Sequence, residues 1–374
     1  MSNGSYRSST LLATCLAVGL LVFFWVQTPA PLHSDSVTGH GRPPPAYDRP
    51  GTLSIHPDRL DGNLTGDAIP YWAPFDATDL DEGHGRLLET LFLAASRVER
   101  IVSPLPATEV ETVLFFGDSN ERGIVDELCI KLGSWPKIIS AKNPPATSDL
   151  WHADPHVCEI ELREQGRKLR LASFMSYGVL IERDSQLWDK KLELDHGPWA
   201  IEERIELARE FVDQMAWGKI DLVIFNSNLW DLMYLHDTHL RLKTAYEFSL
   251  STSTLESYVS RASFALTRIK ASFPTTRVYV RTLHPLHPGR PIDFFNSRRV
   301  SQINQATLEV VARRNGASER EEVRLLDVGK VLEGWPTTNE GGHNILKDKV
   351  HLGWNPGLWM YGEMVLDALA RSRL

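Results

Sequence analysis

The sequence contains no long run of lysine or arginine, and this absence excludes one broad class of function. It has 40 Lys and Arg residues against 48 Asp and Glu residues, which gives a formal net charge of −8. Proteins that bind nucleic acids need clustered positive charge, because much of their affinity comes from neutralising phosphates. Nucleic acid is therefore not an expected partner. The 42% hydrophobic and 24% charged residues instead predict an ordinary globular protein.

Cysteine is also scarce, with 3 residues in a chain of 374. Cys15 lies inside an apolar run, so only Cys129 and Cys158 remain in the rest of the chain. In an oxidising compartment these two could form a disulfide. The alternative is that both are small buried hydrophobic residues, since free cysteine is among the most buried residue types.

Two kinds of ligand site lack their usual sequence signatures. His284 and His287 stand in the proline-flanked stretch HPLHPG, but no third metal-ligating residue clusters with them. We therefore interpret both as surface turn residues, and we expect neither a metal ion nor another cofactor. The turn at Gly117 lacks the repeated glycines that approach a pyrophosphate, which argues against a nucleotide-binding protein.

One apolar run, residues 10–26, has no charged residue and lies near the N-terminus. A helix of about 17–25 apolar residues spans a bilayer, and Arg7 and Trp25 flank this run as membrane anchors do. We predict a cytosolic tail over residues 1–9 and a retained transmembrane signal anchor over residues 10–26. The alternatives are a cleaved signal peptide, which the prolines after the run disfavour, and a buried core helix.

Residues 27–83 are rich in proline and predict an extended stem. Asn63 begins the sequon Asn-Leu-Thr in a polar stretch, which predicts N-glycosylation. Together with the anchor, these features predict a single-pass type II membrane protein of the secretory pathway, in the Golgi or the ER. Its body would then lie in the lumen, and the membrane would be a partner through the N-terminal helix. The oligomeric state stays open.

From Thr112 onward, short apolar runs alternate with longer amphipathic ones. Nearly continuous apolar runs are typical of strands that are covered on both faces, and strand-helix alternation predicts a parallel sheet with right-handed crossovers. We therefore predict an α/β fold, a three-layer α/β/α sandwich with a mostly parallel five-stranded sheet. The expected strands are residues 112–116, 169–175, 221–226, 277–282 and 323–328. The expected helices are residues 120–132, 200–217, 254–272, 297–315 and 356–371.

The residues that directly follow the strands are candidates for chemistry, because ligands bind at the carboxyl ends of parallel strands. The first strand runs into Gly117-Asp118-Ser119, which places Ser119 at a helix N-terminus. Unpaired N–H groups there can stabilise an alkoxide or an oxyanion. Serine is also a favoured N-cap residue, so Ser119 is either a nucleophile or a helix cap.

Two further polar groups follow later strands. Asn226 and Asn228 come after the third strand, where a side-chain amide can donate to an oxyanion, unless the pair simply closes an Asx turn. Asp348 and His351 are three residues apart, so the carboxylate can fix one imidazole nitrogen and leave the other as a base. A surface ion pair is the alternative. The three signals are stronger together, because one edge of the sheet can gather them.

These motifs resemble the SGNH/GDSL hydrolase superfamily, and more closely its PC-esterase branch, which includes trichome-birefringence-like polysaccharide O-acetyltransferases. The resemblance spans about residues 110–374. It is carried by Gly117, Asp118, Ser119 and Arg122; Asn226, Ser227, Leu229, Trp230 and Asp231; Arg281 and Thr282; and Asp348, His351, Pro356, Gly357 and Trp359. It implies an SGNH-type catalytic domain over residues 84–374, with its core at 110–374.

The resemblance also implies a role for each matched residue. Ser119 would be the nucleophile, His351 the general base and acid, and Asp348 the residue that orients the histidine. The oxyanion would be held by the Ser119 N–H together with donors from the second and third blocks. The candidates for these donors are Gly178 and either Asn226 or Asn228. Asp118 and Arg122 would contact the catalytic residues without touching the substrate.

The function implied by the resemblance is that of a serine acyl-esterase or O-acyltransferase with an acyl-enzyme intermediate. Acetyl on a glycan is the implied acyl group and carrier. The expected partners are therefore an acyl ester or an acetylated glycan and, for a transferase, an acyl donor. The alternative from a different class is a catalytically inactive SGNH fold that serves as a membrane-tethered glycan-binding or scaffolding protein.

Overall fold

The computed structural model describes residues 51–60, 68–74, 109–132, 134–139, 155–162, 167–182, 199–243, 248–287, 295–316, 323–337 and 344–371. The predicted tail, anchor and sequon at Asn63 lie outside these residues. Within the described ranges, no helix is both long enough and apolar enough to cross a membrane. Part of the predicted stem is regular: β1 (Gly51–Leu60) and β2 (Ala68–Pro74) pair as antiparallel strands. Pro57 lies in the irregular part of β1, where a missing N–H is tolerated.

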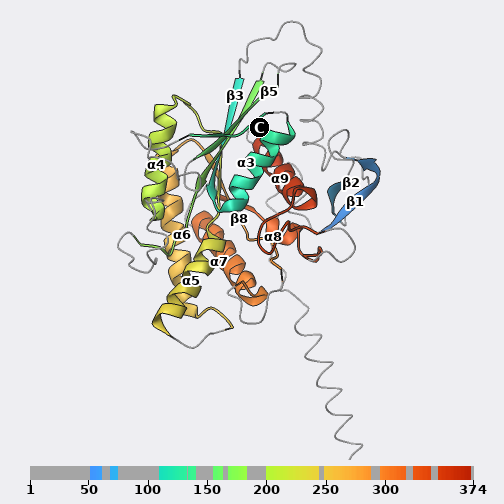
Figure 1. The fold of residues 1–374 in the computed structure, drawn as a ribbon. Helices are drawn as coiled ribbons and strands as arrows, with labels where there is room; N and C mark the ends of the chain where they lie inside the picture. Colours follow the sequence, from blue (N-terminus) through green and yellow to red (C-terminus); the bar gives the residue numbers. More distant parts are fainter. Residues whose placement is uncertain are drawn as a thin grey trace, which may run out of the picture. The chain divides into compact units, whose positions relative to one another are not determined.

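A seven-stranded sheet forms the centre of the fold (Figure 1). Its strands are β3 (Glu109–Gly117), β4 (Lys137–Ile138), β5 (His156–Leu162), β6 (Arg167–Met175), β7 (Leu222–Phe225), β8 (Arg277–Arg281) and β9 (Val323–Leu326). Their order across the sheet is β4-β5-β6-β3-β7-β8-β9. The five strands from β6 to β9 are parallel, whereas β5 and β4 add an antiparallel edge. The predicted mostly parallel α/β sheet is therefore confirmed.

The strands β4 and β5 correct the predicted number of strands from five to seven. In β5, the buried Cys158 and Ile160 alternate with Glu159 and Glu161. Glu159 accepts a hydrogen bond from Arg170 on β6 at 2.8 Å, so one face of this pair carries charged side chains. Such alternation is typical of a strand with one solvated face. Our prediction considered only nearly continuous apolar runs and therefore missed this strand.

Helices cover both faces of the sheet, which confirms the three layers (Figure 1). One face carries α3 (Ser119–Lys131), α8 (Val328–Val331), the π-helical turn η6 (Trp354–Leu358) and α9 (Trp359–Arg371). The other face carries α4 (Ile201–Gln214), α5 (Asn228–Leu242), α6 (Thr252–Ser272) and α7 (Ser297–Gly316). The helix α5 was not predicted.

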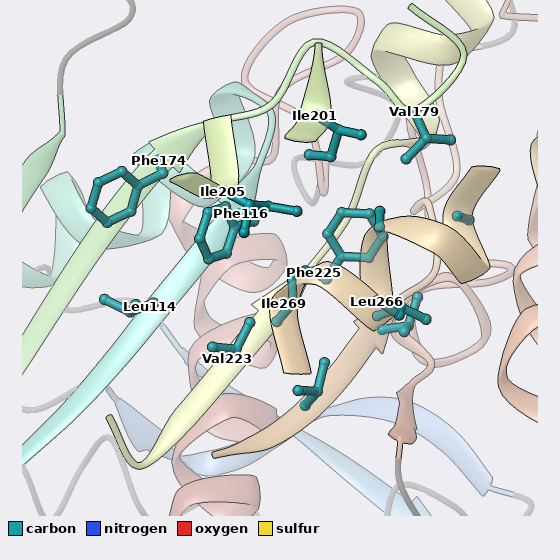
Figure 2. Close-up of a cluster of buried hydrophobic side chains, with 14 of the residues drawn as sticks. Leu114, Phe116, Phe174, Val179, Ile201, Ile205, Val223, Phe225, Leu266 and Ile269 are labelled. Carbon is teal, nitrogen blue, oxygen red and sulfur yellow. The ribbon is translucent and has the colours of Figure 1, made fainter. Parts of the chain in front are cut away.

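Alternating residues of β3 enter two separate cores. Val113 and Phe115 pack in the core beneath α3 and α9, whereas Leu114 and Phe116 pack in the core beneath α4 and α6. Successive side chains of a strand point to opposite faces, so an uninterrupted apolar run serves both layers. Figure 2 shows the second core, in which Phe116 stacks on Phe174 with ring centroids 5.6 Å apart.

The order of the parallel strands reverses at β3. From β3 the chain first adds β6 on one side and then adds β7, β8 and β9 on the other. In open α/β sheets, ligands bind outside the carboxyl ends of the strands at such a reversal. The topology therefore predicts a ligand site at the residues that follow Gly117.

A disulfide joins α3 to the antiparallel edge of the sheet. Cys129 and Cys158 are bonded, with their Cα atoms 5.6 Å apart, and both side chains are fully buried. This bond connects the helix that begins at Ser119 to β5, across a sequence separation of 29 residues.

Replacing both cysteines with alanine should lower the free energy of unfolding by about 3 kcal/mol, because the cross-link restricts a loop of intermediate length in the unfolded chain. Urea denaturation with and without a reductant measures this effect. Reductant should destabilise the wild-type protein and leave the Cys129→Ala/Cys158→Ala variant unchanged. If reductant has the same effect on both proteins, the bond does not contribute to stability.

Candidate active site

Ser119 is the first residue of α3, but it is not the cap of this helix. The N-cap is Asp118, whose Oδ1 accepts the N–H of Asn120 at 2.7 Å. In return, Glu121 Oε2 accepts the Asp118 N–H at 2.8 Å, which completes a capping box. Gly117 leaves room for this carboxylate, since a Cβ at that position would lie 2.2 Å from Glu121 Oε2. The serine hydroxyl is therefore not needed to begin the helix.

The hydroxyl of Ser119 is instead bonded to a histidine from the far end of the chain. Ser119 Oγ lies 2.7 Å from His351 Nε2, and His351 Nδ1 lies 2.7 Å from Asp348 Oδ2. Because a carboxylate only accepts, Nδ1 carries the proton and Nε2 accepts from the serine. This is the orientation that a general base requires. The structure thus brings together three residues that we singled out from the sequence.

Asp348 stays ionised in this arrangement. Its Oδ1 accepts the N–H groups of Val350 and His351, both at 2.8 Å. Burial alone would raise the pKa of Asp348, but these two N–H groups and the His351 ring outweigh it and hold the pKa below its usual value. The side chains of His351 and Asp348 are 31% and 48% exposed, so solvent and small molecules can reach the pair.

Asn226 and Asn228 differ in how their amides are used. Asn226 Nδ2 donates to Asp118 Oδ2 at 3.0 Å and to Glu121 Oε2 at 3.3 Å, which engages both of its N–H groups. Asn228 is the first residue of α5, and its Oδ1 accepts the hydroxyl of Tyr258. The buried Asn228 Nδ2 has no partner among the described residues. A buried donor of this kind is costly unless something accepts from it. Only Asn228 therefore has a side-chain amide available.

Gly178 lies in the turn that follows β6. Its φ of +99° is in the left-handed region, and a Cβ there would lie 2.6 Å from Asp231 Oδ1. This oxygen accepts the N–H groups of Val179 and Leu180, both at 2.8 Å, and Arg261 Nε donates to Val179 O at 3.0 Å. The N–H of Gly178 takes no part in these bonds. The turn is therefore fixed by bonds that do not use the Gly178 N–H.

Asp231 was matched only as part of the resemblance, and its contact with this turn was not predicted. Its side chain is fully buried, and burial raises its pKa to about 7 against the opposing effect of the Leu180 and Val179 N–H groups. The sequence signal is its place three residues into α5, on the same turn as Asn228.

Asp231→Asn should stabilise the protein relative to wild type, and the gain should grow as the pH rises from about 4 to 7. In this window the folded wild-type protein keeps a proton that the unfolded chain, with an ordinary pKa of 3.8, has lost. The contribution of Asp231 to wild-type stability therefore decreases as the pH rises, by at most about 4 kcal/mol for a shift of this size.

Urea unfolding at pH 4 and pH 8 tests this expectation. Glu121 and His284 also titrate in this range, but both proteins contain them, so the difference between the proteins isolates Asp231. A stability difference that is independent of pH would contradict the assignment.

A cluster of buried charged side chains includes Asp118 and Glu121, which are close to Ser119 in the sequence. Arg281, at the end of β8, donates from Nε to Glu121 Oε1 at 2.5 Å, and its Nη2 lies 3.6 Å from Asp118 Oδ2. Tyr361 of α9 donates to the same Glu121 oxygen at 3.0 Å. Burial and the neighbouring Asp118 raise the pKa of Glu121 to about 6, although Arg281 opposes the shift. Burial would also raise the pKa of Asp118, but Arg281 and Asn120 lower it.

Two other sequence predictions concern residues near this cluster. Arg122 is half-buried in the first turn of α3, and its supporting role stays a prediction. His284 was interpreted as a surface residue, which is wrong, because its side chain is fully buried next to Arg281. The flanking proline suggested an exposed turn, whereas the segment directly continues the buried strand β8. His287 is half-buried.

Among the described residues, no group of three or more His, Cys, Asp or Glu side chains could hold a metal ion.

No protein-family model and no curated protein matches the sequence. The solved structures to which the chain is similar include a carbohydrate esterase family 3 protein from Talaromyces cellulolyticus, with 13% identity, a TM-score of 0.37, and coverage of 70% of this chain and 98% of that chain. A GDSL-like lipase from Bacteroides thetaiotaomicron has 13% identity, a TM-score of 0.32, and coverage of 70% and 89%. A family two carbohydrate esterase from Clostridium thermocellum, in complex with cellohexaose, has 12% identity, a TM-score of 0.35, and coverage of 72% and 65%. At these values, any functional argument must come from the site itself.

Proposed function

We propose that the protein is a serine acyl-esterase in which Ser119, His351 and Asp348 form the catalytic triad. One observation carries this proposal: His351 is bonded on one side to Ser119 and on the other to Asp348, both at 2.7 Å. A serine hydroxyl becomes a nucleophile when an adjacent base is oriented by a third group. A helix cap needs neither partner, and Asp118 already serves as the cap.

In the first half of the reaction, Ser119 Oγ attacks the carbonyl carbon of the ester while its proton moves to His351 Nε2. Ionised Asp348 stabilises the imidazolium that forms. The negative charge on the carbonyl oxygen is stabilised by the N–H groups of Ser119 and Gly178 and by Asn228 Nδ2. We assign this role to Asn228 rather than Asn226 because only its amide is available.

In the second half, the tetrahedral intermediate collapses and the alcohol leaves with the proton from His351. The acyl group stays on Ser119 as an ester. Water then attacks this ester and gives its proton to His351. When the bond between the acyl carbon and Ser119 Oγ breaks, His351 returns this proton to Oγ, so that the acid is released and the free serine is restored. A sugar hydroxyl can replace water in this step, which turns the hydrolase into an acyltransferase. We propose acetyl as the acyl group.

A groove between α5 and α6, to which several hydroxyl and charged side chains contribute, supports a carbohydrate ester as substrate. It has a volume of about 760 Å³ and is lined by Leu180, Glu182, Tyr234, Leu235, Ser253, Thr254, Glu256, Ser257, Ser260 and Arg261. Hydroxyl and carboxylate side chains can exchange hydrogen bonds with sugar hydroxyls. Leu180, which lines the groove, belongs to the turn that carries Gly178, one of the proposed oxyanion donors.

We also propose that the protein acts in the lumen of the secretory pathway, anchored by residues 10–26. The uncharged apolar run and the sequon at Asn63 support this location. The disulfide between Cys129 and Cys158 supports it as well, since such bonds persist in oxidising compartments.

The proposal is tested with the full-length protein, a fluorophosphonate probe and two acetyl esters, p-nitrophenyl acetate and an acetylated oligosaccharide. We expect labelling of Ser119 and release of acetate from both esters. Transfer to an unacetylated oligosaccharide, measured by mass spectrometry, would show the acyltransferase reaction. If a folded wild-type protein neither labels nor releases acetate, it is an inactive fold and the proposal is wrong.

A further inference from the structure

We infer that His284 and Asn120 are positioning residues that hold His351 against Ser119 by binding the backbone of the residues directly before and after it. The inference rests on the proposed function for its consequence in catalysis. Neither side chain belongs to the triad or to the oxyanion donors. Both act through the backbone of the residues next to His351.

The two contacts flank the histidine directly in the sequence. His284 Nε2 donates to the carbonyl oxygen of Val350 at 2.9 Å. Asn120 Oδ1 accepts the N–H of Leu352 at 2.8 Å. The exposed fractions of His284 and Asn120 are 0% and 1%, so water does not compete for either bond. The loop is therefore fixed immediately before and immediately after the proposed general base.

Asn120 is bonded directly to the buried carboxylate of Asp118, and His284 is connected to the same carboxylate through Arg281. The N–H and Nδ2 of Asn120 donate to Asp118 Oδ1 at 2.7 and 2.9 Å. On the other side, His284 Nδ1 lies 3.5 Å from Arg281 Nη1, and Arg281 Nη2 lies 3.6 Å from Asp118 Oδ2. Asp118 is also the N-cap of the helix that begins with Ser119. One network therefore sets the position of the nucleophile and that of the base.

The two contacts of His284 together fit one tautomer of the neutral ring. Its Nε2 must carry the proton that it donates to Val350 O, which leaves Nδ1 facing the Arg281 guanidinium as an acceptor. Burial and the charge of Arg281 lower the pKa of His284 to about 4, although Asp118 opposes the shift. His284 is thus neutral throughout the neutral range, which keeps Nδ1 an acceptor next to Arg281.

Loss of one contact should reduce the rate more than it reduces substrate binding. A displacement of about 1 Å at a reacting group can cost on the order of 100-fold in rate. Since neither residue lies in the proposed substrate groove, KM should stay within about twofold of wild type, whereas kcat should fall about 10- to 100-fold.

The test compares His284→Phe with His284→Gln in the full-length protein. Phenylalanine fills the site but cannot donate to Val350 O, whereas the glutamine amide can. We expect kcat on p-nitrophenyl acetate to fall in the Phe variant and to recover in the Gln variant. His156→Phe is the matched control, because His156 is also buried but pairs with Asp126, outside the triad and its supporting network. It should leave kcat unchanged.

A second readout does not depend on turnover. The Nδ1–H proton of His351, bonded to Asp348, should give a downfield NMR signal in the wild-type and Gln proteins that weakens or disappears in the Phe variant. If wild type gives this signal but no ester hydrolysis, the proposed function fails while the positioning role stands. A folded Phe variant with wild-type kcat and a wild-type signal would overturn the inference. Should the Phe variant not fold, Asn120→Ala tests the other side of the loop with the same two readouts.

Discussion

Replacing Ser119 with alanine is expected to lower kcat for ester hydrolysis about 10⁶-fold, because the substitution removes the group that attacks the carbonyl carbon. Stability should change by less than about 0.5 kcal/mol, since the site is partly exposed and Asp118, not Ser119, caps α3. Hydrolysis of p-nitrophenyl acetate and the thermal unfolding midpoint measure the two effects.

Ser251 provides a matched control for this prediction. It is the N-cap of α6, where its hydroxyl accepts the N–H of Thr254 at 3.2 Å. Ser251→Ala should therefore lower stability by about 1 kcal/mol and leave kcat unchanged. The two serines should thus show opposite phenotypes. If Ser119→Ala behaved like Ser251→Ala, the serine would be a structural residue and the triad assignment would be wrong.

The second large effect is expected from Asp348→Asn, which should lower kcat about 10⁴-fold. The asparagine amide would donate to His351 Nδ1, so the imidazole proton would move to Nε2. A protonated Nε2 cannot accept the proton of Ser119. Asparagine keeps an oxygen for the N–H groups of Val350 and His351, so the loop should stay folded. Steady-state kinetics at pH 8 measures the loss.

Asp126→Asn is the control for that substitution. Asp126 also bonds the Nδ1 of a histidine, His156, at 2.8 Å, but this pair lies outside the triad. The kcat of the Asp126→Asn variant should equal that of wild type. Near-wild-type activity of Asp348→Asn would show that the carboxylate does not set the tautomer of His351.

The sequence was informative where chemistry follows the end of a strand. Gly117-Asp118-Ser119 and the Asp348–His351 spacing can be located without coordinates, because a buried strand must end before polar residues begin. The contact between Ser119 and His351 could be expected only from the topology, in which a parallel sheet places strand ends at one edge. The 2.7 Å bond between them agrees with that expectation.

The sequence could not separate Asn226 from Asn228. Both follow β7 within three residues, and their roles depend on where α5 begins and on which partners the amides face. The sequence did not reveal the network around Arg281 for the same reason, because its contacts depend on which residues lie close together in the fold. His284 is close to Arg281 in the sequence, but Glu121 and Tyr361 come from distant parts of the chain, and nothing in their spacing shows that these residues are buried together.

The distance in sequence between the two reacting groups has a consequence for the time at which activity appears. Ser119 and His351 are 232 residues apart, and at about 5–20 residues per second a ribosome needs about 10 to 50 s to synthesise that interval. The segment that follows His351, η6 and α9, then has to complete the core beneath α3. A nascent or prematurely ended chain would thus contain the serine without its base. We therefore expect acyl transfer to begin only after α9 has packed, so that activity also reports that the chain has been synthesised through this helix.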